Sequence, residues 1–235
     1  MHSPYPPPIP ADMLITAYRS GIFPMADSRD DPDLFWVEPR ERAIIPLEGL
    51  RVSRSLKKTL RQDRYTVTLN RDFPAVVAAC AAPRPGHPES WISGRIEASY
   101  AELNRIGHAH SVECWDADGA LVGGLYGVCF DRVFCGESMF SRADNASKVA
   151  LAWLVALMNR AHYRLLDCQF MTDHLASLGA CELPQADYLQ LVAKADGQPH
   201  CSLPQAYASL SSEAAGLDGP SSPGKLIAQS FTQTS

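Results

Sequence analysis

A carboxylate and an amide occupy alternate positions in a short apolar segment, residues 165–170 (LLDCQF). In an extended strand the side chains alternate between the two faces, so Asp167 and Gln169 are expected to point to one side together. Polar groups in a buried strand are costly unless they have hydrogen-bonding partners or line a cleft. The pair therefore indicates either a structural hydrogen-bonded pair or a ligand site at the carboxyl end of a central strand.

A second carboxylate, Glu137, lies in a similar apolar segment, residues 134–140 (FCGESMF). Gly136 beside it would let a ligand approach the backbone closely. Each carboxylate alone is weak evidence. If the two segments are neighbouring strands, Glu137 and Asp167 together predict a negatively lined pocket.

Other residue types that often act in catalysis are present, but the sequence around them lacks the partners that such chemistry needs. His108 and His110 could place two imidazoles on one strand face, but no third ligand is indicated, so no metal site is predicted. Ser177 has no nucleophile-elbow pattern, and no basic partner is indicated for the cysteines, so a covalent nucleophile is not predicted. The seven cysteines contain no Cys-x-x-Cys pair, which favours reduced thiols over a zinc site or a disulfide framework.

The segments around these residues predict a mixed α/β domain. The turn at Asp118-Gly119 between alternating segments is typical of a hairpin joining strands over 110–115 and 121–130. A strand over 133–140, an apolar helix that Asp144 or Asn145 caps and that ends near Arg160, and a strand over 164–170 form a strand–helix–strand unit. Its two strands should therefore be parallel. A further strand is expected from Tyr65, and further helices over 74–82, 96–106, 173–178 and 184–193.

This order of elements suggests an acetyltransferase-like (GNAT-type) fold. Such enzymes need a glycine-rich turn between strand and helix, where backbone N–H groups hold the pyrophosphate of CoA. Here the turn, residues 141–147 (SRADNAS), has no glycine and contains an acid. We therefore expect the fold without the coenzyme site, and an acyl donor other than CoA.

Basic residues are concentrated in one short segment, although the net charge is −5. A helix within residues 53–64, capped by Ser53 or Ser55, would place four cations on one face, namely Arg54, Lys57, Lys58 and Arg61. Such a stripe on an acidic protein favours a polyanion site over a merely solvated helix face. With roughly four to six phosphate contacts, log affinity should fall against log salt with a slope of roughly −3 to −5.

The 235 residues, 46% of them hydrophobic, are enough for one large domain with a small addition. Residues 1–40 predict a small N-terminal domain with a proline-rich arm, a helix from Asp12 closed at Gly21, and a strand at 34–37. Residues 41–195 predict the catalytic domain, and the Ser/Pro/Gln/Gly-rich residues 196–235 a disordered tail. No membrane span or signal peptide is indicated, so we expect a cytoplasmic protein.

A series of motifs runs in order along residues 17–193. They are 17–24 (AYRSGIFP), 53–56 (SRSL), 107–113 (GHAHSVE), 123–128 (GGLYGV), 136–141 (GESMFS), 146–148 (ASK), 166–169 (LDCQ) and 173–180 (DHLASLGA). Together they make the chain resemble the leucyl/phenylalanyl-tRNA–protein transferases. The resemblance implies an enzyme that transfers Leu, Phe or, less well, Met from aminoacyl-tRNA to proteins with N-terminal Arg or Lys, and we expect it to be a monomer. That transfer marks the acceptor for N-end-rule degradation.

The resemblance also implies roles for particular residues. Asp167 and Gln169 match the pair proposed to act on the attacking amine, and Glu137 matches the acid of the aminoacyl site. Other matches are the apolar wall of that site (Leu125, Leu151, Leu154, Leu166), residues near the terminal adenosine (Trp91, Tyr100), and a tRNA-binding cluster (Arg54, Lys57, Lys58, Arg61). Two positions depart from the family pattern: Met25 stands where many members have tryptophan, and Thr172 where many have asparagine.

Aminolysis of an aminoacyl ester needs orientation and proton transfer, but no cofactor or metal. We expect Gln169, oriented by Asp167, to accept a hydrogen bond from the attacking amine, and Asp167 to stabilise the charge developing on its nitrogen. Two other hypotheses remain open. One is an acetyl-CoA-dependent N-acetyltransferase, and the other a non-catalytic RNA-binding module in which the polar strand residues are structural.

Overall fold

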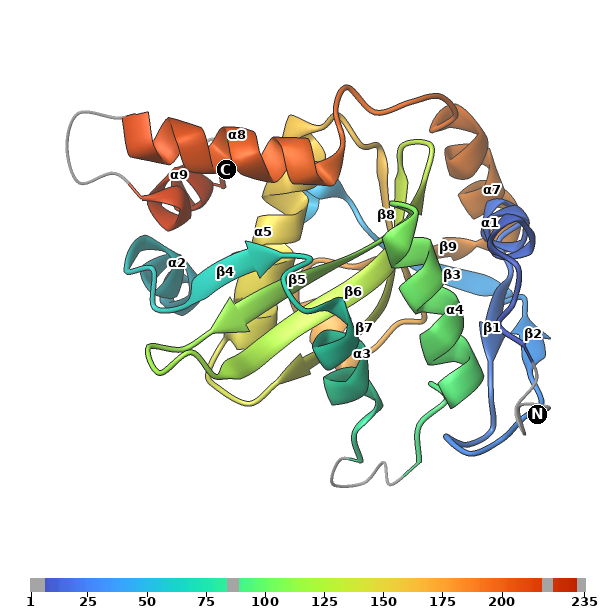
Figure 1. Ribbon diagram of the computed structural model, residues 1–235. Helices are drawn as coiled ribbons and strands as arrows, with labels where there is room; N and C mark the ends of the chain where they lie inside the picture. Colours follow the sequence, from blue (N-terminus) through green and yellow to red (C-terminus); the bar gives the residue numbers. More distant parts are fainter. Residues whose placement is uncertain (1–6, 84–88, 217–221, 232–235) are drawn as a thin grey trace.

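A computed structural model of the chain describes residues 7–83, 89–216 and 222–231 (Figure 1). Its centre is a seven-stranded sheet with the order β4-β5-β6-β7-β8-β3-β9. The strands are β3 (Glu41–Ile45), β4 (Thr66–Leu69), β5 (Ala109–Trp115), β6 (Leu121–Phe130), β7 (Val133–Ser141), β8 (Leu165–Gln169) and β9 (Cys181–Pro184). Neighbouring strands are antiparallel except β7 and β8, which are parallel, as the strand–helix–strand unit predicts. The mixed α/β class is thereby confirmed.

Helices cover both faces of this sheet (Figure 1). One face carries α5 (Ala146–Arg160), with α2 (Arg54–Arg61), α8 (Leu203–Gly216) and α9 (Pro223–Ser230) packed around it. The other face carries α3 (Phe73–Ala81) and α4 (Gly94–Arg105), with α1 (Ala11–Arg19) and α7 (Gln185–Lys194) contributing to the same core. The short elements are η1 (Leu47–Gly49), α6 (Asp173–Ser177), and a hairpin of β1 (Phe23–Met25) with β2 (Phe35–Val37).

The two helices that matter most for the site follow directly from their sequences. α5 is apolar nearly all round because it is buried between the sheet and the surrounding helices. Asn145 occupies its N-cap position in a left-handed conformation, without a side-chain capping bond. In α2 the Ser53 hydroxyl accepts a hydrogen bond from the Leu56 N–H, so the predicted serine cap is confirmed.

The parallel strands β7 and β8 separate after a short pairing. They pair only where Val133, Phe134 and Cys135 lie opposite Leu165, Leu166 and Asp167. Both strands continue past this point, and the β6–β7 register shifts nearby, between Tyr126 and Gly127. The divergence opens the sheet at the carboxyl ends of two central strands, where open α/β sheets tend to place ligands.

The described residues of the C-terminal segment, 196–216 and 222–231, do not form the disordered tail that its composition predicts. In α8 the side chains of Leu203, Ala206 and Leu210 are buried, and in α9 those of Ile227 and Ala228 are buried in the same core as α5. The apolar residues of these helices form a narrow face at helical spacing, which the polar residues between them make hard to recognise in the sequence. Packing of that face against the core stabilises the helices, although their composition alone would not. The predicted domain boundary after residue 40 stays a prediction. None of the helices in the described ranges is long and apolar enough to span a membrane.

Candidate active site

A pocket of about 810 Å³ opens where β7 and β8 diverge. All four predicted wall leucines line it, namely Leu125, Leu151, Leu154 and Leu166, together with Met25 and Trp91. The polar side chains Glu137 and Gln169 also line it. The structure therefore brings eight of the residues singled out in the sequence to one cavity, from the β1–β2 hairpin, β6, β7, α5, β8 and the segment before α4.

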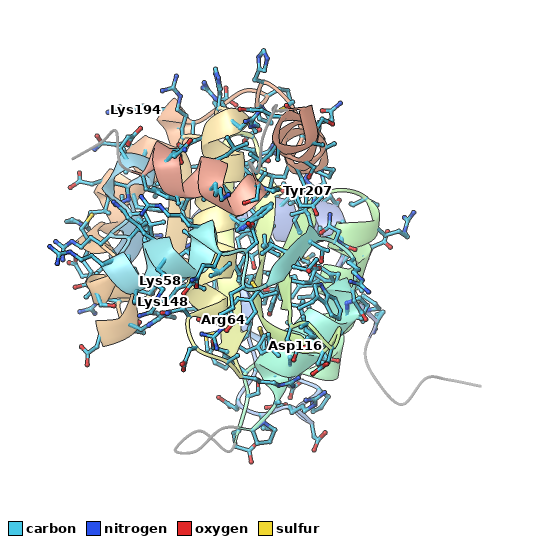
Figure 2. All side chains as sticks on the ribbon, turned by 90° about the vertical axis from the view of Figure 1, so that its left-hand side faces the viewer. Lys58, Arg64, Asp116, Lys148, Lys194 and Tyr207 are labelled. Atoms are coloured by element: carbon cyan, nitrogen blue, oxygen red, sulfur yellow. The ribbon has the colours of Figure 1, made fainter. Side chains whose placement is uncertain are left out.

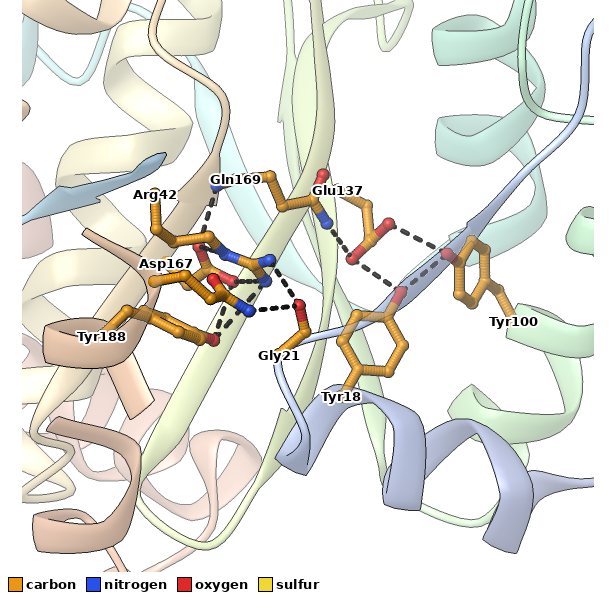
Figure 3. A network of polar contacts seen from close by, with 9 residues as sticks. Tyr18, Gly21, Arg42, Tyr100, Glu137, Asp167, Gln169 and Tyr188 are labelled. Atoms are coloured by element: carbon orange, nitrogen blue, oxygen red, sulfur yellow. Dashed lines mark hydrogen bonds and ion pairs between the residues drawn. The ribbon is translucent and has the colours of Figure 1, made fainter. Parts of the chain in front are cut away.

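Glu137 lies at the centre of a hydrogen-bond network on one side of this pocket (Figure 3). Its Oε1 accepts hydrogen bonds from Tyr18 (2.8 Å) and from the Gln169 side-chain amide (2.8 Å), and its Oε2 accepts one from Tyr100 (2.9 Å). Burial raises the pKa of Glu137 to about 7, although the bonds from Tyr18 and Tyr100 act to lower it. Tyr100 is fully buried, so it supports Glu137 from behind rather than lining the pocket.

The network also fixes the orientation of the Gln169 amide. Its Nε2 donates to Glu137, which turns its Oε1 away from the carboxylate. Among the described residues, no donor reaches this oxygen, and it is not sealed off from solvent. An uncommitted hydrogen-bond acceptor is thereby presented beside the apolar wall.

Asp167 and Gln169 point to the same face of the sheet, as strand alternation predicts. Asp167 bonds Tyr188 and Gln169 bonds Glu137 on the face that α1, α4 and α7 cover, whereas Leu166 and Cys168 belong to the core around α5. Asp167 differs from Gln169 in that it is fully buried and absent from the pocket lining. Gln169 has φ +63°, a left-handed conformation at the end of β8, and its N–H donates to Asp167 Oδ1 at 2.8 Å.

Sequence reasoning missed the main partner of Asp167, which is Arg42 on β3. The fully buried guanidinium donates to both carboxylate oxygens, from Nε at 2.9 Å and from Nη2 at 2.6 Å. Its Nη1 donates to the Gly21 carbonyl at 2.9 Å, and the Tyr188 hydroxyl donates to Asp167 Oδ2 at 3.1 Å (Figure 3). Burial lowers the pKa of Arg42, but Asp167 outweighs that effect and raises it above its usual value. The available signal was the position of Arg42, a cation directly before the apolar run Ala43–Ile45 of the same strand.

The basic helix lies apart from the pocket. Arg54, Lys58 and Arg61 are exposed and Lys57 is half-buried. Within the part of the chain that the structure describes, none of the four takes part in an ion pair. α2 packs against α5, whose other residues line the pocket, so the cations sit beside the site without entering it.

His110 lies on β5 and His108 just before it, so they are not two positions of one strand, and both have structural neighbours. His110 Nδ1 lies 2.8 Å from the Asn70 amide, and His108 Nδ1 lies 3.0 Å from the Cys129 carbonyl. Across the described ranges, no group of three or more His, Cys, Asp or Glu residues is placed to hold a metal ion.

Fold and site together define an α/β protein with a largely apolar pocket, a free amide oxygen of Gln169 at its wall, and a separate basic surface. Sequence comparison agrees in detail. The family model of the leucyl/phenylalanyl-tRNA protein transferases matches residues 44–193, and the model of their N-terminal domain matches residues 8–40. The chain belongs to the leucyl/phenylalanyl-tRNA protein transferase family.

Named relatives support this assignment. The chain is 56% identical to a leucyl/phenylalanyl-tRNA–protein transferase of Novosphingobium aromaticivorans, over 98% of each chain. It is 58% identical to the protein of the same name from Rhizorhabdus wittichii, over 80% of this chain and 76% of that one. The predicted family resemblance is confirmed.

Among solved structures, L-PGS from Bacillus licheniformis aligns with 71% of this chain and 55% of its own, at 13% identity and a TM-score of 0.37. A likeness of this size carries no argument about the fold. The acetyltransferase-like subtype of the mixed sheet therefore stays a prediction.

Proposed function

We propose that the chain transfers leucine, phenylalanine or, less well, methionine from aminoacyl-tRNA to the N-terminal Arg or Lys of acceptor proteins, which marks them for N-end-rule degradation. The observation that carries the proposal is the apolar pocket with the free Oε1 of Gln169 at its wall. The leucines would receive the transferred side chain, and the adjacent oxygen would meet the attacking amine. The names of the relatives support the donor and the reaction class.

Gln169 is proposed to orient the acceptor's α-amine. A free α-amine has a pKa near 8, so a useful fraction is a competent nucleophile at neutral pH. Holding it beside the ester carbonyl contributes roughly 7 kcal/mol or more through orientation. The Gln169 Oε1 can accept a hydrogen bond from this amine, while Glu137 holds the amide group in the productive orientation.

Asp167 is proposed to act through the backbone of Gln169 rather than on the amine. Its oxygens already accept bonds from Arg42, Tyr188 and the Gln169 N–H. A left-handed conformation at a non-glycine residue costs roughly 1–2 kcal/mol, so it must be held by its surroundings. The ion pair with Arg42 supplies that support, and Asp167 is therefore a positioning residue.

The surface of α2 is proposed to hold the tRNA. Its four cations, none of which forms an ion pair with another described residue, offer the electrostatic attraction that dominates affinity for nucleic acids. Trp91 at the pocket is proposed to stack on the terminal adenosine, as aromatic side chains do on unpaired bases. That the chain acts as a monomer in the cytoplasm stays a prediction.

The test is transfer of radiolabelled phenylalanine from Phe-tRNA to a peptide that begins with Arg, with a matched peptide that begins with Ala. Label on the Arg peptide alone would establish the reaction and the acceptor rule. Salt-sensitive binding of tRNA without transfer would instead show an RNA-binding module in which Asp167 and Gln169 are structural. Acylation from acetyl-CoA would show an N-acetyltransferase.

A further inference from the structure

Two cations besides those of α2 lie at the rim of the pocket. Arg142 follows β7, is exposed, and lines the pocket itself. Its guanidinium lies 5.2 Å from the centre of the Phe140 ring and donates to the Leu121 carbonyl at 3.3 Å. These contacts hold the guanidinium at the pocket rim, although the residue as a whole is exposed to solvent.

Lys148 lies in the first turn of α5, between the pocket and the basic helix. Its neighbour Ser147 lines the pocket, and so does His174, whose pKa is lowered by burial and by the charge of Lys148. On its other side, α5 packs against α2. In Figure 2, Lys58, Lys148 and Arg64 appear on the side of the molecule that faces the viewer. The path from α2 to the pocket rim runs over α5, with Lys148 in its first turn and Arg142 on the loop before it.

Neither cation on this path is neutralised by a protein carboxylate. Across the described ranges, no ion pair includes Arg142 or Lys148. Asp144 is the acid on the connecting loop, and it too forms no ion pair there. Lys148 is half-buried, and a cation that is partly removed from water beside an apolar pocket gains most from an anionic ligand.

We propose that Lys148 and Arg142 bind backbone phosphates of the single-stranded 3′ end of the tRNA. The inference rests on the proposed function and deepens it. The aminoacyl nucleoside enters the pocket, while the tRNA body lies on α2, so the last nucleotides must cross the surface between them. Each crossing nucleotide brings one phosphate, and these two cations lie along the crossing.

Three donors of increasing length test this assignment. Phenylalanyl-adenosine has no phosphate, phenylalanyl-CCA trinucleotide has only the phosphates of the 3′ end, and Phe-tRNA has all of them. The variants are Lys148→Gln with Arg142→Gln, Arg54→Gln with Lys58→Gln, and Lys194→Gln as a matched loss of one charge. Figure 2 shows Lys194 away from Lys58 and Lys148, at the end of α7.

The Lys148/Arg142 variant should raise KM about tenfold for the trinucleotide and for tRNA, and leave KM for phenylalanyl-adenosine within about twofold. The Arg54/Lys58 variant should affect tRNA alone, and Lys194→Gln none of the donors. Equal losses with phenylalanyl-adenosine would overturn the proposal, because the cations would then shape the pocket. An unchanged KM for the trinucleotide would overturn it as well.

A binding measurement keeps this test independent of turnover. For uncharged tRNA, the slope of log affinity against log salt should become shallower by about 1.4 in the Lys148/Arg142 variant, since each single-strand phosphate contact contributes about 0.7. An unchanged slope would overturn the proposal. If the unmodified protein transfers from none of the donors, the proposed function fails, and the slope alone decides whether the two cations bind phosphate.

Discussion

Arg42 and Asp167 form a fully buried ion pair directly behind Gln169, with both carboxylate oxygens bonded to the guanidinium at 2.9 and 2.6 Å. The same Arg42 donates to the Gly21 carbonyl, and the same Asp167 accepts the Gln169 N–H. The pair thereby ties the segment after α1 and strand β3 to the end of β8. At that end of β8, Gln169 has a left-handed conformation.

Asp167→Asn should lower the transfer rate at least about tenfold without changing the KM for tRNA. The substitution places an amide NH₂ among donors and leaves the Arg42 charge buried and unpaired, which costs about 3–5 kcal/mol of stability. Single-turnover transfer and urea denaturation measure the two effects. A loss of less than about tenfold, in a folded protein with normal tRNA affinity, would contradict the positioning role.

A double variant separates positioning from stability. Arg42→Met with Asp167→Leu removes both charges, so it should recover part of the stability that either single change loses. Transfer should stay as low as in the single variants, because the Gln169 N–H has still lost its acceptor. Recovery of transfer together with stability would show that the ion pair is only structural. Tyr188→Phe is a milder control. It removes one hydrogen bond to Asp167 and should lower the free energy of unfolding by about 1 kcal/mol.

Gln169→Glu should reduce transfer about 100-fold or more while leaving tRNA binding intact. It replaces the Nε2 donor with an oxygen next to Glu137, so the bond that orients the side chain is lost and two carboxyl groups face each other. Rates with saturating Phe-tRNA measure the effect, and a filter-binding assay checks affinity. Transfer at the unmodified rate would show that the Gln169 amide does not meet the amine.

Glu137 should make the protein less stable as pH rises from about 4.5 to about 7. Burial raises the pKa of Glu137 in the folded state to about 7, so the folded protein binds more protons than the unfolded chain in this window. Stability then falls with rising pH, by up to about 3 kcal/mol from this group. Glu137→Gln should remove this part of the dependence, as measured by urea denaturation at pH 4.5, 6 and 7.5. Identical pH profiles would contradict the raised pKa.

Gly224→Ala should destabilise the protein by about 1–3 kcal/mol. A Cβ at Gly224 would meet the Leu60 carbonyl oxygen of α2, so α9 would have to move off the basic helix. In an unobstructed helix the same change stabilises by about 0.5–1 kcal/mol. Gly216→Ala, which has nothing within 4 Å of the new Cβ, is the matched control. Equal midpoints of urea denaturation for the two variants would show that α9 does not pack on α2.

Local patterns in the sequence determined much of the framework. The Ser53 cap of α2, the Asp118-Gly119 hairpin and the apolar α5 between two parallel strands follow from spacing and turn chemistry, which act over a few residues. The sequence also identified the pocket leucines and the basic helix. Matching family motifs and counting the spacing of cations require no knowledge of tertiary contacts.

Tertiary structure decided how the polar residues work. Arg42 and Asp167 are 125 residues apart, and no local pattern pairs them. Strand alternation correctly placed Asp167 and Gln169 on one face, but it did not show that Asp167 is buried against Arg42 and Tyr188 while Gln169 reaches the pocket. α8 and α9 are likewise ordered by the core they cover rather than by their own composition. The partners of a buried carboxylate and the order of a polar segment both depend on long-range packing, which only the folded chain supplies.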